Sequence, residues 1–130
     1  MIANRAPTVG LPDQPTVSMG VALALVDAVE RAGVSRSELL RAAQLDPEQL
    51  ANAEARLPLS ELFRIAEFAL DLTGDPAFGL HWAERQTASS FVPVSYLIAQ
   101  SADLRQGFAS LSQFARLLSD EPGYELSEQD

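Results

Sequence analysis

The sequence contains no cysteine and a single histidine, His81, among its 130 residues. Without cysteine, the chain forms no disulfide, holds no cysteine-ligated metal and has no cysteine nucleophile. One histidine cannot build a two-histidine metal site, and no G-x-S-x-G pattern supplies a serine nucleophile that could use it. We therefore interpret His81 as a packing or surface residue, and we expect no enzyme activity and no cofactor.

Lysine is also absent, so the nine basic residues are all arginines. Against 18 acidic residues they leave a formal net charge of −9 at pH 7. A protein that binds duplex DNA gains most of its affinity by neutralising phosphates with lysine and arginine. The sequence therefore predicts that this chain by itself does not bind duplex DNA.

No long hydrophobic run is present. The apolar stretch 19–29 is interrupted by Asp27 and is shorter than the roughly 20 residues that a membrane span needs. It predicts a buried first helix, with Ser18 as its N-cap and Gly33 just past its end. Residues 1–16 contain three prolines and no apolar period, which indicates a flexible tail rather than a signal peptide. We expect no membrane partner and a cytoplasmic location.

Cap residues mark the starts of further helices. Ser35 and Glu38 have the spacing of a capping box, in which a serine hydroxyl accepts from the amide three residues on. The other expected starts are at Asp46, Asp75, Pro93 and Asp103. Residues 17–120 therefore predict one all-α domain, a compact orthogonal bundle of about six to seven helices.

The residues from Pro58 to Gly74 predict a central helix. Pro58 suits the first helical turn, and Gly74 suits the left-handed position after the last one. Its polar residues fall on one narrow stripe, formed by Ser60, Arg64, Glu67 and Asp71. Because apolar residues such as Phe63 occupy nearly all the rest of the circumference, we expect this helix to be the most buried one.

The last expected helix carries an apolar seam at helical spacing, formed by Leu104, Phe108, Leu111, Ala115 and Leu118. Such a seam also suits a helical interaction module that dimerises or binds a partner protein. Beyond it, Tyr124, Glu125 and Leu126 alternate as the start of a strand does. We therefore expect residues 121–130 to begin a continuation that is cut off here.

Three aromatic residues, Trp82, Phe91 and Tyr96, bracket a small, polar segment at 86–92 that is expected to be a loop. Small-molecule pockets are commonly lined by aromatic side chains, so these three are the candidate ligand-binding residues. The competing interpretation is that Trp82 and Phe91 fill the core between helices.

Two segments resemble a known family. They are RAGVSRSELLRAAQLDPEQLANAEARLPLSELFRIAEFALDLTGDPAFGLHWAE and SYLIAQSADLRQGFASLSQFARLLSD, and their most telling parts are LTGDPAFGL and FARLLSD. In order and spacing they are similar to the amino-terminal, arabinose-binding-like effector domain of AraC-type transcriptional regulators. The likeness covers roughly residues 20–120, and the chain departs from the usual pattern at Val92 and Gly107, where Gly and Ala are expected.

The resemblance implies a ligand-sensing or regulatory domain. Family members typically continue into β-strands and then into two helix-turn-helix motifs that bind DNA, and both parts are missing here. It follows that the full-length protein is expected to bind DNA and a small-molecule effector, whereas this fragment does not bind DNA. A homodimer is a further expected assembly. We also expect the helices to form one wall of the effector pocket and the β portion to supply the rest.

Overall fold

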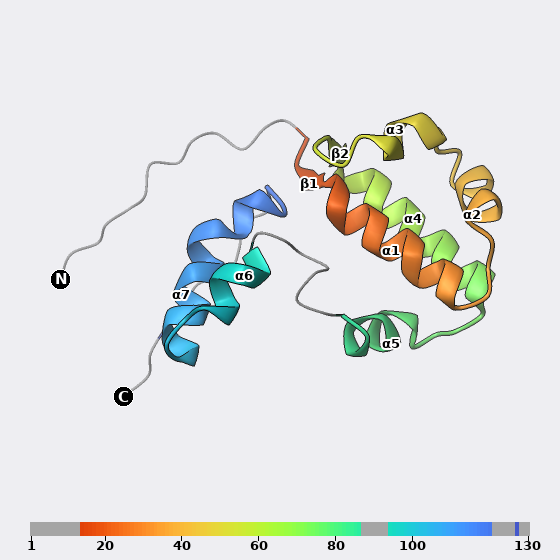
Figure 1. Cartoon of the computed structure of the whole chain (residues 1–130). Helices are drawn as coiled ribbons and strands as arrows, with labels where there is room; N and C mark the ends of the chain where they lie inside the picture. Colours follow the sequence, from red (N-terminus) through yellow and green to blue (C-terminus); the bar gives the residue numbers. More distant parts are fainter. Residues whose placement is uncertain (1–13, 87–93, 121–126, 128–130) are drawn as a thin grey trace.

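The computed structural model describes residues 14–86, 94–120 and 127 of the chain. Within these residues it contains seven α-helices, one 3-10 helix and two short strands (Figure 1). In chain order these are β1 Thr16–Ser18, α1 Met19–Arg31, α2 Arg36–Ala42, α3 Pro47–Ala51, β2 Arg56–Pro58, α4 Leu59–Thr73, α5 Phe78–Glu84, α6 Val94–Ala99, α7 Leu104–Phe114 and η2 Ala115–Leu117. The prediction of a mostly helical fold is confirmed. The strand-like residues 124–126 lie outside the described part.

Local hydrogen bonds explain where most helices begin. The side chains of Ser18, Ser35, Asp46 and Asp103 each accept a bond from a backbone N–H in the first turn of α1, α2, α3 and α7. An N-cap of this kind satisfies one of the amide groups that a helix start leaves unpaired. All four caps were predicted from the sequence. At the other end of α4, Gly74 has φ of 63°, the left-handed conformation that glycine adopts without strain.

Two helix starts differ from the prediction. Pro58 does not stand inside the first turn of α4 but precedes it, with an extended ψ of 135°. It is extended because it ends β2, whose pairing with β1 holds the backbone straight. The fifth helix begins at Phe78 rather than next to Asp75, because the Asp75 side chain accepts from the Ala77 amide and forms a turn ahead of the helix.

The two strands were not predicted, and they place residue 16 in a sheet rather than in the flexible tail. They pair antiparallel, with Val17 opposite Leu57, and both of these side chains are buried in the core. The sheet closes one end of the helical core, where α1 and α4 start side by side (Figure 1). The amide of Leu59 donates to the carbonyl of Pro15, so the entry to α4 is bonded to the residue ahead of β1.

The core of the structure is built mainly on α1. Six of its residues are buried, whereas α4 buries three, Leu59, Ile65 and Ala69. The prediction that the central helix is the most buried is therefore wrong, and Phe63 is 56% exposed. The reason is that α1 and α2 cover one side of α4, while the side that carries Phe63 and Leu70 faces away from the core.

Helices α6 and α7 pack against each other as a pair beside the rest of the chain (Figure 1). The apolar seam that begins on α7 is covered unevenly: Leu104 is 81% exposed and Phe108 is 51% exposed, whereas Ala115 is buried. The expected single helix up to Leu118 instead ends at Phe114 and continues as the 3-10 turn η2.

A polar cluster of Thr16, Arg56 and Asp120 ties the end of this pair to the sheet. Asp120 accepts from the backbone N–H of Thr16 at 2.9 Å and from the Thr16 hydroxyl. The guanidinium of Arg56 lies 3.2 Å from the Asp120 carboxylate and donates to Thr16 Oγ1 at 2.6 Å. The hydroxyl of Thr16, its amide and the charge on Arg56 together hold the pKa of Asp120 below its ordinary value. The cluster thus joins three segments that are far apart in the sequence.

Candidate functional site

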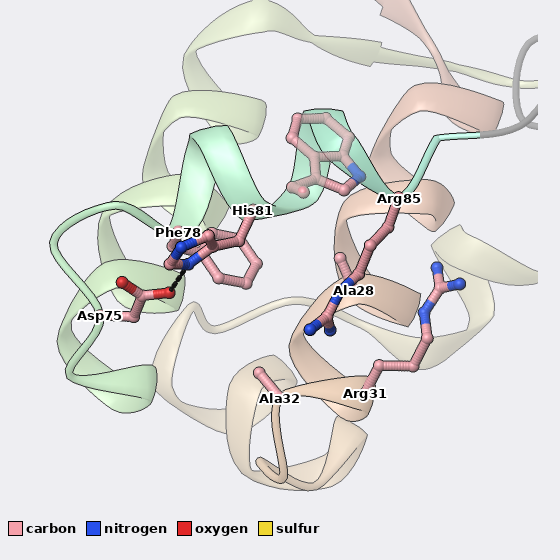
Figure 2. Close-up of a pocket in the computed structure, with 8 residues that line it drawn as sticks. Ala28, Arg31, Ala32, Asp75, Phe78, His81 and Arg85 are labelled. Atoms are coloured by element: carbon pink, nitrogen blue, oxygen red, sulfur yellow. Dashed lines mark hydrogen bonds and ion pairs between the residues drawn. The ribbon is translucent and has the colours of Figure 1, made fainter.

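A cavity of about 180 Å³ lies between the last turns of α1 and helix α5. Figure 2 shows side chains from both helices directed toward it. It is lined by Ala28, Arg31 and Ala32 on one side and by Asp75, Phe78, His81, Trp82 and Arg85 on the other. The two alanines leave room because they present only a methyl group, and the buried ring of Phe78 supplies an apolar wall.

Two arginines reach the cavity without a carboxylate partner among the described residues. The Nε–H of Arg31 donates to the carbonyl of Asp27 at 3.2 Å, and no acidic side chain pairs with Arg31 or Arg85 in that part of the chain. Arg36, Arg56 and Arg64, by contrast, each form an ion pair with an acidic side chain. In a chain of net charge −9, two guanidiniums that form no ion pair among the described residues, beside a single acidic side chain in the same lining, give a local excess of positive charge.

The only acidic side chain that lines the cavity is already engaged. Asp75 Oδ2 lies 2.6 Å from Nδ1 of His81, and Asp75 Oδ1 accepts from the Ala77 amide at 2.9 Å (Figure 2). The hydrogen bond with His81 is the main cause that lowers the pKa of Asp75 below its ordinary value of 3.8. An ionised carboxylate only accepts, so Nδ1 of His81 carries the proton. Nε2 of His81 is the nitrogen that this hydrogen bond does not use.

The cavity also has an unsatisfied donor among its lining residues. The indole Nε1 of Trp82 is buried and has no hydrogen-bond partner within the described residues. Burying such a group without a partner costs free energy, about 1–3 kcal/mol in typical cases. The set of side chains therefore combines two cationic groups, one histidine and one buried N–H around a small apolar wall.

Two other hollows are weaker candidates. A groove of about 670 Å³ runs along α2, but its Arg36 already pairs with Asp27 and Glu30 at 3.7 Å each. A cavity of about 80 Å³ between α6 and α7 is lined by apolar residues around Gly107. Neither combines an aromatic wall with charges that lack a partner, so the cavity between α1 and α5 is the best-formed candidate site.

Within 14–86, 94–120 and 127, no three histidine, cysteine or acidic side chains gather where they could hold a metal ion. None of the helices in these ranges has both the length and the apolar character of a transmembrane segment.

Comparison with known proteins identifies the family. The model of the arabinose-binding domain of AraC transcription regulators, N-terminal part, matches residues 33–130. The chain belongs to this AraC family. A similar protein is the ornithine utilization regulator of Pseudomonas aeruginosa, 32% identical over 102 residues, which are 78% of this chain and 30% of the relative. The family consists of transcription regulators rather than enzymes, so the predicted resemblance and the predicted lack of enzyme activity are confirmed.

The AraC-type domain brings together only part of the residue set that the sequence suggested. Trp82 lines the cavity, whereas Tyr96 lies on α6, is 60% exposed and is not among the lining residues. Phe91 lies outside the described residues. Ligand binding by any of the three stays a prediction.

Sequence reasoning missed Arg31, Asp75 and Arg85 and assigned His81 no site role. The sequence did contain one signal: Phe78, His81 and Trp82 on α5 and Arg85, which caps its end, follow the spacing of one helix face. The contribution of α1 had no such signal, since Arg31 lies about 50 residues before α5 in the sequence and comes near it only through folding.

Proposed function

We propose that this chain is the signal-sensing domain of a cytoplasmic AraC-type transcription regulator and that it binds a small-molecule effector. The main support is the family match over residues 33–130. DNA binding then belongs to a part of the regulator outside this chain, because the net charge of −9 opposes contact with phosphates. The relative is about three times as long as the matched segment, which leaves room for such a part.

The size of the cavity supports a compact effector. A drug-sized ligand fills a pocket of roughly 300–1,000 Å³, whereas the cavity between α1 and α5 has about 180 Å³. The relative is named for the utilization of ornithine, which is a molecule of amino-acid size. We therefore include amino acids with cationic, neutral and anionic side chains, ornithine among them, in the first effectors to test.

The experiment compares the regulator extended through its DNA-binding part with residues 1–130 alone. We expect the extended protein to shift a duplex from its own promoter region, and its response to depend on an effector. Residues 1–130 should show no salt-sensitive shift of the same duplex. The proposal fails if the extended protein does not bind DNA, or if no metabolite changes the expression of a reporter under its control.

A second function is favoured by the exposed apolar surface of α6 and α7. Tyr96, Leu104 and Phe108 are all more than half exposed, and a surface of this kind commonly marks a protein–protein contact. The alternative is a dimerisation module, and light scattering of residues 1–130 tests it. A dimer that Leu104→Glu converts to a monomer supports this function, whereas a monomer at all concentrations excludes it.

A further inference from the structure

We propose that the cavity between α1 and α5 binds the carboxylate group of a compact, negatively charged molecule through Arg31 and Arg85. The inference builds on the proposed sensing function and adds the chemical class of the ligand. It rests on the charges of the cavity, on its size and on the aromatic wall beside the charges.

The two arginines provide the recognition. Arg31 is the last residue of α1 and Arg85 directly follows α5, and both line the same cavity (Figure 2). Neither has a carboxylate partner in the described residues. A guanidinium presents a planar set of N–H donors that matches the two oxygens of a carboxylate. Two guanidiniums beside one small cavity offer an anion more charge and more N–H donors than a single surface arginine does.

The remaining charges do not cancel this preference. Asp75 accepts from His81 and from the Ala77 amide, so its carboxylate is already hydrogen-bonded within the protein. The two arginines carry two positive charges against the single negative charge of Asp75, so the lining is net positive without any contribution from His81. A ligand with a cationic side chain meets repulsion there, and a neutral ligand offers the two guanidiniums no opposite charge.

The apolar part of the lining limits the body of the ligand. Phe78 is 6% exposed and Trp82 is partly buried, so a short hydrocarbon chain or a single ring can cover them. The volume of about 180 Å³ lies below the range of drug-sized pockets. The ligand class is therefore a small mono- or dicarboxylate.

Trp82 is the only tryptophan in the sequence, so the tryptophan fluorescence of the protein reports on this cavity alone. We would titrate succinate and benzoate into residues 1–130 and follow Trp82 fluorescence together with calorimetry. Succinamide and benzamide have the same shape without the charge, and free arginine carries a cationic side chain. We expect a carboxylate to change the fluorescence and to bind at least about tenfold more tightly than its amide, since each charged hydrogen bond is worth about that factor.

Charge-removing variants test the residues. Arg31→Gln and Arg85→Gln should each weaken carboxylate binding about tenfold. Arg116→Gln removes the same charge from an exposed position on η2 and should leave binding unchanged. Circular dichroism shows whether each variant folds, and both cavity arginines are exposed enough for the fold to tolerate the change.

Two results overturn the inference. One is the absence of any fluorescence or calorimetric response to the carboxylates, and the other is binding that survives both arginine substitutions. If a neutral or cationic metabolite instead controls the full-length regulator, the sensing function stands and the carboxylate assignment is wrong. If carboxylates bind but Arg85→Gln leaves regulation unchanged in the full-length protein, the site stands and its sensing role fails.

Discussion

Two substitutions on α4 separate the observed packing from the one expected from the sequence. Ile65 is completely buried in the core cluster, whereas Phe63, two residues earlier on the same helix, is 56% exposed. Both residues are large and apolar, and both lie in the interior of a helix. Replacing each with alanine therefore changes the helix propensity little and tests mainly what surrounds the side chain.

The expected magnitudes follow from burial. Ile65→Ala removes three carbon atoms from a closed core and should lower the free energy of unfolding by about 2–4 kcal/mol. Full burial of a phenylalanine is worth about 1.5–3 kcal/mol, and less than half of Phe63 is covered, so Phe63→Ala should cost about 1 kcal/mol at most. A domain of this size is stable by about 5–15 kcal/mol, so both variants should still fold.

Urea denaturation, followed by circular dichroism, gives the free energy of unfolding of each variant. Glu67→Ala, exposed on the same helix, serves as the control and should change it by no more than about 0.5 kcal/mol. If Phe63→Ala costs as much as Ile65→Ala, the face of α4 that points away from α1 must be covered. Phe63 would then belong to the core together with Ile65.

Two further predictions concern the junction between the sheet and Asp120, and a third concerns the packing of α6 against α7. Arg56→Gln should lower the free energy of unfolding by about 1–2 kcal/mol in chemical denaturation, because it removes the charge beside Asp120 from a partly exposed cluster. The lowered pKa of Asp120 means that its carboxylate stabilises the fold above the unfolded value of 3.8, and that this contribution is lost as the pH falls below it. Thermal melts in acid should therefore show a smaller loss of stability for Asp120→Asn than for the parent. Gly107→Ala should increase the free energy of unfolding by about 0.5–1 kcal/mol and so raise the melting temperature, because alanine favours the interior of a helix. The added Cβ would lie 3.6 Å from Ile98, an ordinary contact distance. A lower melting temperature would show that α6 and α7 pack too closely for a methyl group.

The outcome at α4 shows why a hydrophobic pattern overestimates burial. Its apolar residues cover most of the helix circumference, and the sequence alone indicates that such a helix is packed on several sides. In the structure α1 and α2 cover one side of it, and Leu70 remains 42% exposed on another. The apolar pattern of a helix shows which of its faces can be buried. Which faces are buried depends on the helices that pack against it.

The sequence by itself determined the features that depend on bonds between residues close in the chain. The caps formed by Ser35, Asp46 and Asp103 each involve a partner two or three residues away, and the left-handed turn at Gly74 depends on that residue alone. Interactions of this kind are nearly independent of the rest of the molecule, so the cap motifs predicted them correctly.

Tertiary structure decided what depends on segments far apart in the chain. Val17 pairs with Leu57 across about 40 residues, and neither three-residue strand is long enough to give a pattern of its own. The meeting of Arg31 with Arg85 at one cavity has the same origin, since it requires α5 to fold back beside the end of α1. Such contacts form only when the free energy gained by burying the core offsets the conformational entropy that the whole chain loses on folding. A short segment of the sequence therefore does not show which distant residues will meet.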